Sequence, residues 1–187
     1  MAAMEIKGTA FLSKRQQIIR MHDEARWNVF LADLRRKHPF FVRHILATTL
    51  IPVDTFLAFM DELLVHFFGG DERAYWEMGA RSADWALREG PYQLFGADRD
   101  IARFIVGMEQ LWSIYFTTSR LQLGFDGRCV DAQASGLPVW HGYFEYMVMG
   151  YLQRAFELVG WRVTVERLTP PRTRDFRYHF TLEAKEK

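Results

Sequence analysis

The sequence predicts an α+β fold in which an N-terminal helical part packs on a C-terminal antiparallel sheet. In the first two-thirds of the chain, apolar residues recur at intervals of three and four, which is typical of amphipathic helices. After Arg120 they alternate as in strands, except in one helical segment that ends at Gly160. The C-terminal part is therefore predicted as hairpin, helix, hairpin, with the helix covering one face of the sheet and water on the other.

The chain starts with a short predicted strand followed by a long helical segment. Residues 4–11, MEIKGTAF, suit a strand that could be added to the C-terminal sheet, although Gly8 weakens it. Helical periodicity then runs from about Lys14 to Arg36, with a break expected near Asp23.

Prolines, glycines and capping aspartates delimit the remaining N-terminal helices. Pro39 is expected in a first helical turn, because proline there loses no helical hydrogen bond, and Pro52 is expected near the start of the next helix. The helix from Pro39 is predicted to continue through Leu46, and the one from Pro52 to end at a Gly-Gly pair. Asp71 and Asp98 are predicted to cap the next two helices, which end at Gly90 and near Ser119 with the turn PYQLFGAD between them.

The C-terminal elements have stronger signals. Asp126-Gly127 predicts a hairpin turn between two strands. A long helix is predicted over about 139–159, and Gly160 suits the left-handed residue that commonly ends a helix. Two strands follow, WRVTVERL and FRYHFTLEA, joined by the turn TPPRTRD. The side chains predicted to face the helix are Trp161, Val163 and Val165 in the first strand and Phe176, Tyr178, Phe180 and Leu182 in the second.

Length and composition favour one folded domain over residues 1–187. Hydrophobic residues make up 49% and charged residues 25% of the 187 positions, close to the globular average. Within this domain, the helical part is expected at about 12–119 and the sheet-and-helix part at about 120–187, together with the strand at 4–11.

Charge and cysteine content exclude several classes of function. A net charge of +1 gives no basic field of the kind that nucleic-acid binding requires. The single cysteine, Cys129, excludes an internal disulfide and a cysteine-cluster metal site, and so favours the cytoplasm. No apolar run reaches the 18 residues of a membrane-spanning helix, and MAAMEIKG lacks the apolar core of a signal peptide.

Three stretches carry a family resemblance: EIKGTAF near the start, then GYLQRAFELVGWRVTVERL and FRYHFTLEA. In this order they resemble a paralogous bacterial family of the myxobacterial type. That family is similar to 4-vinyl-reductase-like small-molecule-binding domains and, more distantly, to heme nitric-oxide/oxygen-binding (H-NOX) domains. The resemblance implies a sensory or ligand-binding fold in which helices enclose a cavity against an antiparallel sheet.

The residues that would bind heme in an H-NOX domain are not found at the expected places. The resemblance implies a proximal histidine on the helix before the sheet, but Arg99 to Ser119 contains none. It also implies a Tyr-x-Ser-x-Arg pattern, and YFTTSR has the wrong spacing. His66, in the apolar run LLVHFF, is the only candidate axial ligand. Heme is therefore not expected, nor is a metal, since the metal-binding vinyl-reductase-like domains use several cysteines.

Two helical stripes of aromatic and methionine side chains are the candidate ligand-binding residues. Rings bring polar atoms that need partners when buried, and methionine adapts to irregular shapes, so such stripes suit an apolar pocket. The same stripes are equally typical of an ordinary core, and the sequence leaves both interpretations open. The stripes comprise Phe104, Met108, Trp112 and Tyr115 in the first helix and Tyr143, Met147 and Tyr151 in the second.

No catalytic set emerges, so the chain is not expected to be an enzyme. The adjacent Asp61 and Glu62 point in different directions on their helix, which makes them poor acid–base partners. The sequence thus favours a non-enzymatic cytosolic domain that binds a small apolar molecule for sensing or regulation. Two alternatives remain: a protein-interaction module with a filled core, forming a homodimer or binding a regulatory partner through an exposed aromatic patch, and a heme-based gas sensor.

Overall fold

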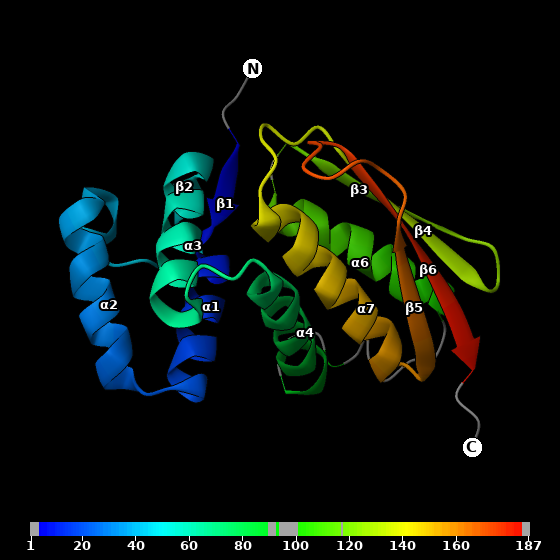
Figure 1. The fold of residues 1–187 in the computed structure, drawn as a ribbon, viewed down its shortest axis with the longest axis horizontal. Coiled ribbons are helices and arrows are strands. Elements are labelled where there is room, and N and C mark those ends of the chain that lie inside the picture. Colours follow the sequence, from blue (N-terminus) through cyan, green and yellow to red (C-terminus); the bar gives the residue numbers. More distant parts are fainter. Residues whose placement is uncertain (1–3, 90–92, 94–100, 117, 185–187) are drawn as a thin grey trace. The chain divides into compact units, whose positions relative to one another are not determined.

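The computed structural model describes residues 4–89, 93, 101–116 and 118–184 (Figure 1). The chain divides into two compact units. Unit 1 comprises Met1–Ala74 with Tyr115–Thr117, and unit 2 comprises Tyr75–Ile114 with Thr118–Lys187. The mixture of helices and antiparallel sheet confirms the predicted α+β class. The expectation that all residues form a single domain stays a prediction.

Unit 1 begins with a strand much shorter than predicted. Strand β1 spans Glu5–Lys7 and pairs antiparallel with β2, Leu50–Pro52. Adding the N-terminal strand to the C-terminal sheet is therefore wrong. Helix α1, Gly8–Met21, starts at the glycine, whose N–H donates to Thr49 O at 2.7 Å. Only glycine fits there, because a Cβ would lie 2.0 Å from the Leu46 carbonyl oxygen.

The predicted break near Asp23 is confirmed. Helix α2 spans Glu24–Lys37, and the Asp23 carboxylate caps it by accepting from Arg26 N at 2.7 Å. The helix predicted from Pro39 through Leu46 is wrong, because only the single 3₁₀ turn η1, Pro39–Val42, forms. Arginine side chains occupy two carbonyls that a longer helix would have used: Arg35 donates to Phe41 O and Arg43 to Phe40 O.

Aromatic rings fill the interior of unit 1 around helix α3, Val53–Phe68. This helix ends at Gly69, in the left-handed conformation expected of a helix-terminating glycine (φ 62°). Phe59 is fully buried and its ring meets several others, so the bulky side chains of three helices and η1 form one cluster. Its members are Phe11, Trp27, Phe30, Phe41, Phe56 and Phe59.

Helix α4, Arg73–Arg88, leads from unit 1 into unit 2, and its first turn is capped as predicted: Asp71 Oδ1 accepts from Arg73 N at 3.0 Å. The predicted turn PYQLFGAD, the cap at Asp98 and the helix end at Gly90 lie outside the described residues, apart from position 93. Helix α6 then spans Ile101–Tyr115.

A four-stranded antiparallel sheet in the order β3-β4-β6-β5 completes unit 2. Strands β3 and β4 form the predicted Asp126-Gly127 hairpin, in which the Asp126 carboxylate accepts from the Arg128 and Cys129 N–H groups and Gly127 has a φ of 100°. These backbone donors hold the pKa of Asp126 below its usual range. The strands are β3 Arg120–Phe125, β4 Cys129–Ser135, β5 Trp161–Arg167 and β6 Phe176–Ala184.

The helix predicted at 139–159 begins later and in a different conformation. A π-helical turn, η2, spans Tyr143–Met147 and leads into α7, Val148–Leu158. Helices α6 and α7 lie on the same face of the sheet (Figure 1), and the Phe156 ring joins them by meeting Phe104 and Phe180 at centroid distances of 5.7 and 5.6 Å. The predicted inward face of β6 is confirmed as buried, whereas that of β5 is half-buried because β5 is an edge strand.

Candidate functional site

The first predicted ligand-binding stripe lies on the buried face of α6. Phe104, Met108 and Trp112 are all buried there. Phe104 packs on Phe156 of α7, and the Trp112 indole N–H donates to Ser119 Oγ at 3.1 Å. Both of these side chains therefore already have a close neighbour within unit 2.

The second stripe follows the π-helical turn into α7. Tyr143 and Met147 are buried in η2, whereas Tyr151 is half-buried in α7. Tyr115, from the first stripe, is half-buried at the end of α6 and belongs to unit 1, whereas the other six predicted residues belong to unit 2. That these seven residues bind a ligand stays a prediction.

A buried carboxylate that was not predicted from the sequence organises η2. Glu145 is 0% exposed. Its Oε1 accepts from Arg167 Nε at 2.5 Å and from the Tyr178 hydroxyl at 2.7 Å, and its Oε2 accepts from the Trp140 indole N–H. A buried carboxylate is tolerated only when it is paired and hydrogen-bonded, and this one has a cation and two neutral donors. We call these four residues the Glu145 centre.

The Glu145 centre ties the π-helical turn to two neighbouring strands. Arg167 at the end of β5 is directly opposite Tyr178 on β6, so both side chains reach the same carboxylate oxygen. Burial, and then the bond to Glu145, raise the pKa of Tyr178 above its usual range, so its hydroxyl stays protonated and donates. The signal in the sequence was the single acidic residue in the otherwise apolar run YFEYMVM.

Two glycines allow helix α4 to approach η2 and α7 very closely. A Cβ on Gly79 would lie 2.0 Å from the Met147 carbonyl oxygen, and one on Gly150 would lie 2.3 Å from the Trp76 carbonyl oxygen. Each helix thus presents its backbone to the other, and any larger residue at either position would separate them.

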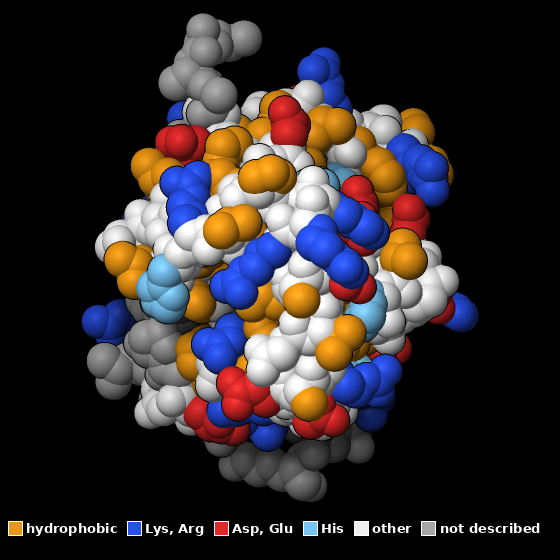
Figure 2. Space-filling view, turned by 90° about the vertical axis from the view of Figure 1, so that its left-hand side faces the viewer, with side chains coloured by type: hydrophobic (Ala, Val, Ile, Leu, Met, Phe, Trp, Pro, Cys, Tyr) orange, Lys and Arg blue, Asp and Glu red, His pale blue; other side chains and the backbone are white. Residues whose placement is uncertain are grey.

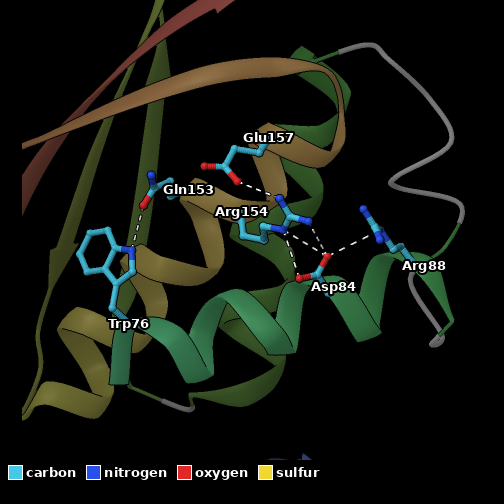
Figure 3. Close-up of polar contacts among 6 residues, drawn as sticks. All are labelled: Trp76, Asp84, Arg88, Gln153, Arg154 and Glu157. Carbon is cyan, nitrogen blue, oxygen red and sulfur yellow. Dashed lines mark hydrogen bonds and ion pairs between the residues drawn. The ribbon is translucent and has the colours of Figure 1, made fainter. Parts of the chain in front are cut away.

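Polar side chains fix this helix pair in register (Figure 3). Trp76 Nε1 of α4 donates to Gln153 Oε1 of α7 at 2.8 Å. About two turns further along α4, the Asp84 carboxylate accepts from Arg154 Nε at 3.1 Å and from Arg154 Nη2 at 2.9 Å, while Arg154 Nη1 donates to Glu157 at 2.9 Å. The two carboxylates raise the pKa of Arg154, so its charge is permanent.

Unit 1 also contains one buried charged residue that sequence reasoning missed. Lys14 of α1 is 4% exposed, and its Nζ donates to Gln17 Oε1 at 3.2 Å. Burial lowers the pKa of Lys14 from 10.5 to about 7, because the charged form is the one that burial penalises. The signal in the sequence was Lys14 itself. It lies four residues from both Ala10 and Ile18, on a side of the helix where these neighbours are apolar.

The surface of unit 1 shows no aromatic patch among the residues that the structure describes. Figure 2 shows single hydrophobic side chains interspersed with lysine and arginine on the face it presents. The large exposed apolar residues of unit 1 are aliphatic, and every Phe, Tyr and Trp in the described ranges is buried or half-buried. Single exposed aliphatic residues are normal on soluble proteins. A homodimer or regulatory partner stays a prediction. The residues concerned are Val29, Val42, Leu46, Leu50 and Val65.

Comparison with known proteins gives a fold and no sequence family. No protein-family model matches the chain, and no curated protein matches it. Solved structures do match. A mutant of the T. Tengcongensis H-NOX is similar with a TM-score of 0.70 and 11% identity, covering 95% of this chain and 98% of that one. The chain has the H-NOX fold.

Two further structures agree with this result. An oxygen-binding H-NOX domain related to soluble guanylate cyclases has a TM-score of 0.69 at 12% identity and covers 97% of this chain and 100% of its own. A mutant of the K. algicida H-NOX, in its Fe(II) unliganded form, has a TM-score of 0.69 at 8% identity over 95% of this chain and 97% of its own. The predicted H-NOX resemblance is confirmed for the fold. The resemblance to vinyl-reductase-like domains and to the myxobacterial-type family stays a prediction.

The residues of this chain do not fit a heme held in the H-NOX manner. His66 is exposed on α3, with its ring against Phe30 and Phe67 at 5.4 and 4.6 Å. None of the six histidines, all of them described, is buried, and α6 carries none between Ile101 and Tyr115. The sequence nowhere contains Tyr-x-Ser-x-Arg.

Two further observations concern the described residues only. No group of three or more His, Cys, Asp and Glu side chains among them could hold a metal ion. No helix in the described part of the chain is long and apolar enough to cross a bilayer.

Proposed function

We propose that this chain is a non-enzymatic sensory or regulatory domain of the cytosol that binds a small, largely apolar molecule without heme. The observation that carries the proposal is the H-NOX fold over 95–97% of the chain combined with six histidines of which none is buried. Of the solved structures that share this fold, one is an oxygen-binding H-NOX domain and another concerns the molecular mechanism of H-NOX activation. In this proposal the domain senses a small apolar molecule, and that molecule takes the place of the heme.

The structural route for a signal is the Glu145 centre. A ligand that contacts Met147 or Tyr143 acts on the π-helical turn, and π-helical turns occur frequently at functional sites. Glu145, in the same turn, is bonded to β5 and β6 through Arg167 and Tyr178. A ligand that prefers one packing of this turn therefore shifts the equilibrium of the helix–sheet junction, which a partner protein can recognise.

A ligand screen on the full chain tests the proposal. The purified protein is mixed with lipids, phenols and tetrapyrroles and followed by native mass spectrometry and by the unfolding temperature. Binding of an apolar molecule is expected to raise that temperature in the native chain and in Ile114→Val, whose side chain is exposed on α6, and much less in Trp112→Phe. A protein that binds none of these molecules would overturn the proposal.

Heme is tested separately by expression with a heme precursor. The expected absorbance spectrum has no Soret band. A Soret band that disappears in His66→Ala would replace the proposal with a heme-based sensor.

A further inference from the structure

The two edges of the sheet in unit 2 differ in how their outer backbone groups are satisfied. Strands β3 and β5 form these edges (Figure 1). At the β3 edge, Glu109 of α6 accepts a hydrogen bond from the Leu123 N–H at 2.7 Å. An unpaired row of backbone donors and acceptors is a template for another strand, and a side chain bound to that row hinders such pairing. Among the described residues, no side chain does the same at the β5 edge.

The outer backbone groups of β5 belong to its odd-numbered residues. The Leu168 N–H donates to Arg177 O at 2.9 Å, across the ladder that joins β5 to β6. Successive backbone groups of a strand point to opposite sides, so the N–H and C=O groups of Val163 and Val165 point away from β6. The ladder has no bulge and β5 contains no proline. Strand β5 therefore offers a regular edge to which another strand can be added.

Charged side chains on β5 restrict which strand fits this edge. Arg162 and Glu166 are both exposed, and Thr164 lies midway between them on the same face of the sheet. If two β5 strands pair antiparallel about Thr164, Arg162 of each copy lies opposite Glu166 of the other. The same register places the outer backbone groups of Val163 opposite those of Val165, where each pair of residues exchanges two hydrogen bonds. Two β5 strands are thus complementary in charge and in backbone groups.

The neighbouring strand β6 extends the charge complementarity. Within one copy, Arg162 is opposite Glu183 and Glu166 is opposite His179. In the paired arrangement, each Arg162 would lie between two carboxylates, Glu183 of its own copy and Glu166 of the other. Registers centred on Arg162 or on Glu166 would instead bring like charges directly opposite each other, which is unfavourable.

The inward face of β5 is compatible with the same register. Val163 and Val165 are half-buried, and each would be covered further by the other valine of the second copy. Arg167, the charged residue on this face, already pairs with Glu145, so it brings no unpaired charge to the contact.

We propose that β5 is a homodimerisation strand, which pairs antiparallel with β5 of a second copy about a two-fold axis at Thr164. The two sheets then continue into each other, and the same residues form the contact in both copies. One short strand from each copy buries less than the roughly 1,200 Å² of a standard interface, so the dimer is weak and forms only at high concentration. The inference involves no ligand and is independent of the proposed function.

Charge exchange between copies tests the inference. Sedimentation velocity of the full chain, from micromolar to millimolar concentration, should show the average mass rising from monomer to dimer. Arg162→Glu and Glu166→Arg each bring like charges together, so each is expected to weaken the dimer at least about tenfold. An equimolar mixture of these two variants should dimerise about as well as the native chain, because every introduced charge then meets its opposite.

Arg177→Glu is the matched control. It makes the same change of charge at another exposed position of the sheet, but on β6, which lies inside the sheet and not at its edge. This variant should dimerise like the native chain. Circular dichroism checks that all the variants are folded.

The backbone contact has its own readout. Val163→Pro removes an outer N–H, and proline is tolerated in an edge strand where its N–H would face solvent, so this variant should fold and stay monomeric. Hydrogen exchange at the amides of Val163 and Val165 should slow with concentration in the native chain and in Arg177→Glu, but not in Arg162→Glu.

Several outcomes would overturn the inference. They are a native chain that is monomeric at every concentration, a dimer that Arg162→Glu and Arg177→Glu affect equally, and a mixture of the two charge variants that stays monomeric. Protection of the Val163 and Val165 amides in a monomeric chain would also overturn it, since another segment of the same chain would then cover the edge.

Discussion

Among the described residues, each compact unit buries one charged side chain, and the two differ in how burial is tolerated. In unit 2, Glu145 is 0% exposed and its carboxylate is surrounded by an arginine cation and two neutral donors. In unit 1, Lys14 is 4% exposed, shares its amine with the neutral amide of Gln17, and has its pKa lowered to about 7 by burial. The Glu145 carboxylate accepts hydrogen bonds from three side chains, whereas burial lowers the pKa of the Lys14 amine.

The difference indicates different roles for the two residues. A charge that its neighbours neutralise stabilises a particular arrangement, here the junction of η2 with β5 and β6. A buried amine instead costs stability while it is charged, so its contribution to stability changes with pH. Four substitutions test this contrast, and Glu145→Ala has the largest expected effect.

Glu145→Ala is expected to destabilise the protein by about 3–5 kcal/mol, since it leaves the Arg167 guanidinium, 18% exposed, without its carboxylate. Urea unfolding followed by circular dichroism measures the change in the free energy of unfolding. Glu166→Ala, at an exposed position of β5, is the control and should change it by less than about 0.5 kcal/mol. A loss below about 1 kcal/mol in Glu145→Ala would show that the centre does not hold the junction.

Gly79→Ala tests whether the Glu145 centre depends on the approach of α4. The new Cβ would lie 2.0 Å from the Met147 carbonyl oxygen, two residues from Glu145, so the helices must separate. We expect a loss of about 2–3 kcal/mol in the free energy of unfolding, although alanine usually stabilises a helix. Gly124→Ala is the matched control, because a Cβ added there would have nothing within 4 Å. Equal effects of both substitutions on the unfolding midpoint would contradict the close approach.

Lys14→Met is expected to stabilise the protein at pH 7, by about 1–3 kcal/mol, because it removes an amine that must lose its charge or its solvation. The folded-state pKa is lowered, so the unfolded chain holds more protons between pH 7 and 10.5 and the native protein gains stability as pH rises. Lys14 should contribute about 2 kcal/mol of this gain between about pH 7 and 9. Thermal unfolding across this range should show a steeper rise for the native chain than for Lys14→Met, and parallel curves would refute the lowered pKa.

Arg154→Ala is expected to have the smallest effect, about 0.5–1 kcal/mol. Its ion pair with Asp84 is bidentate but partly exposed, at 30% and 36% for the two side chains, and water screens it. Arg36→Ala removes the more exposed pair with Asp33 and should have almost no effect. Chemical unfolding of both variants measures the difference. A loss above about 2 kcal/mol in the free energy of unfolding of Arg154→Ala would show that this ion pair contributes more than a partly exposed pair should.

The sequence predicted the elements whose signals are local. The Asp126-Gly127 hairpin, the caps at Asp23 and Asp71 and the helix end at Gly69 depend on residues a few positions apart. Strand β1 could not be placed in this way, because its partner, Leu50–Pro52, lies far along the chain and offers only three residues.

In the candidate sites, too, only features that depend on residues close together in the sequence were predicted. The apolar spacing of Phe104, Met108 and Trp112 predicted correctly that they face inward on α6. The Glu145 centre was missed because Glu145, Arg167 and Tyr178 are more than about ten residues apart, and only the folded chain brings them together. Lys14 was missed because helical periodicity predicts burial from apolar residues only, and a lysine between them is taken as exposed.

The strand order of unit 2 also has a consequence for biosynthesis. Strand β6 lies inside the sheet, between β4 and β5, yet it is the last of the four to be translated. Until the ribosome has released residues 176–184, β4 and β5 each lack a neighbour, and the face of α7 that meets β6 stays uncovered. Most of unit 1 precedes residue 75 and has by then left the exit tunnel. A nascent chain paused before β6 would therefore expose the apolar surface that molecular chaperones recognise.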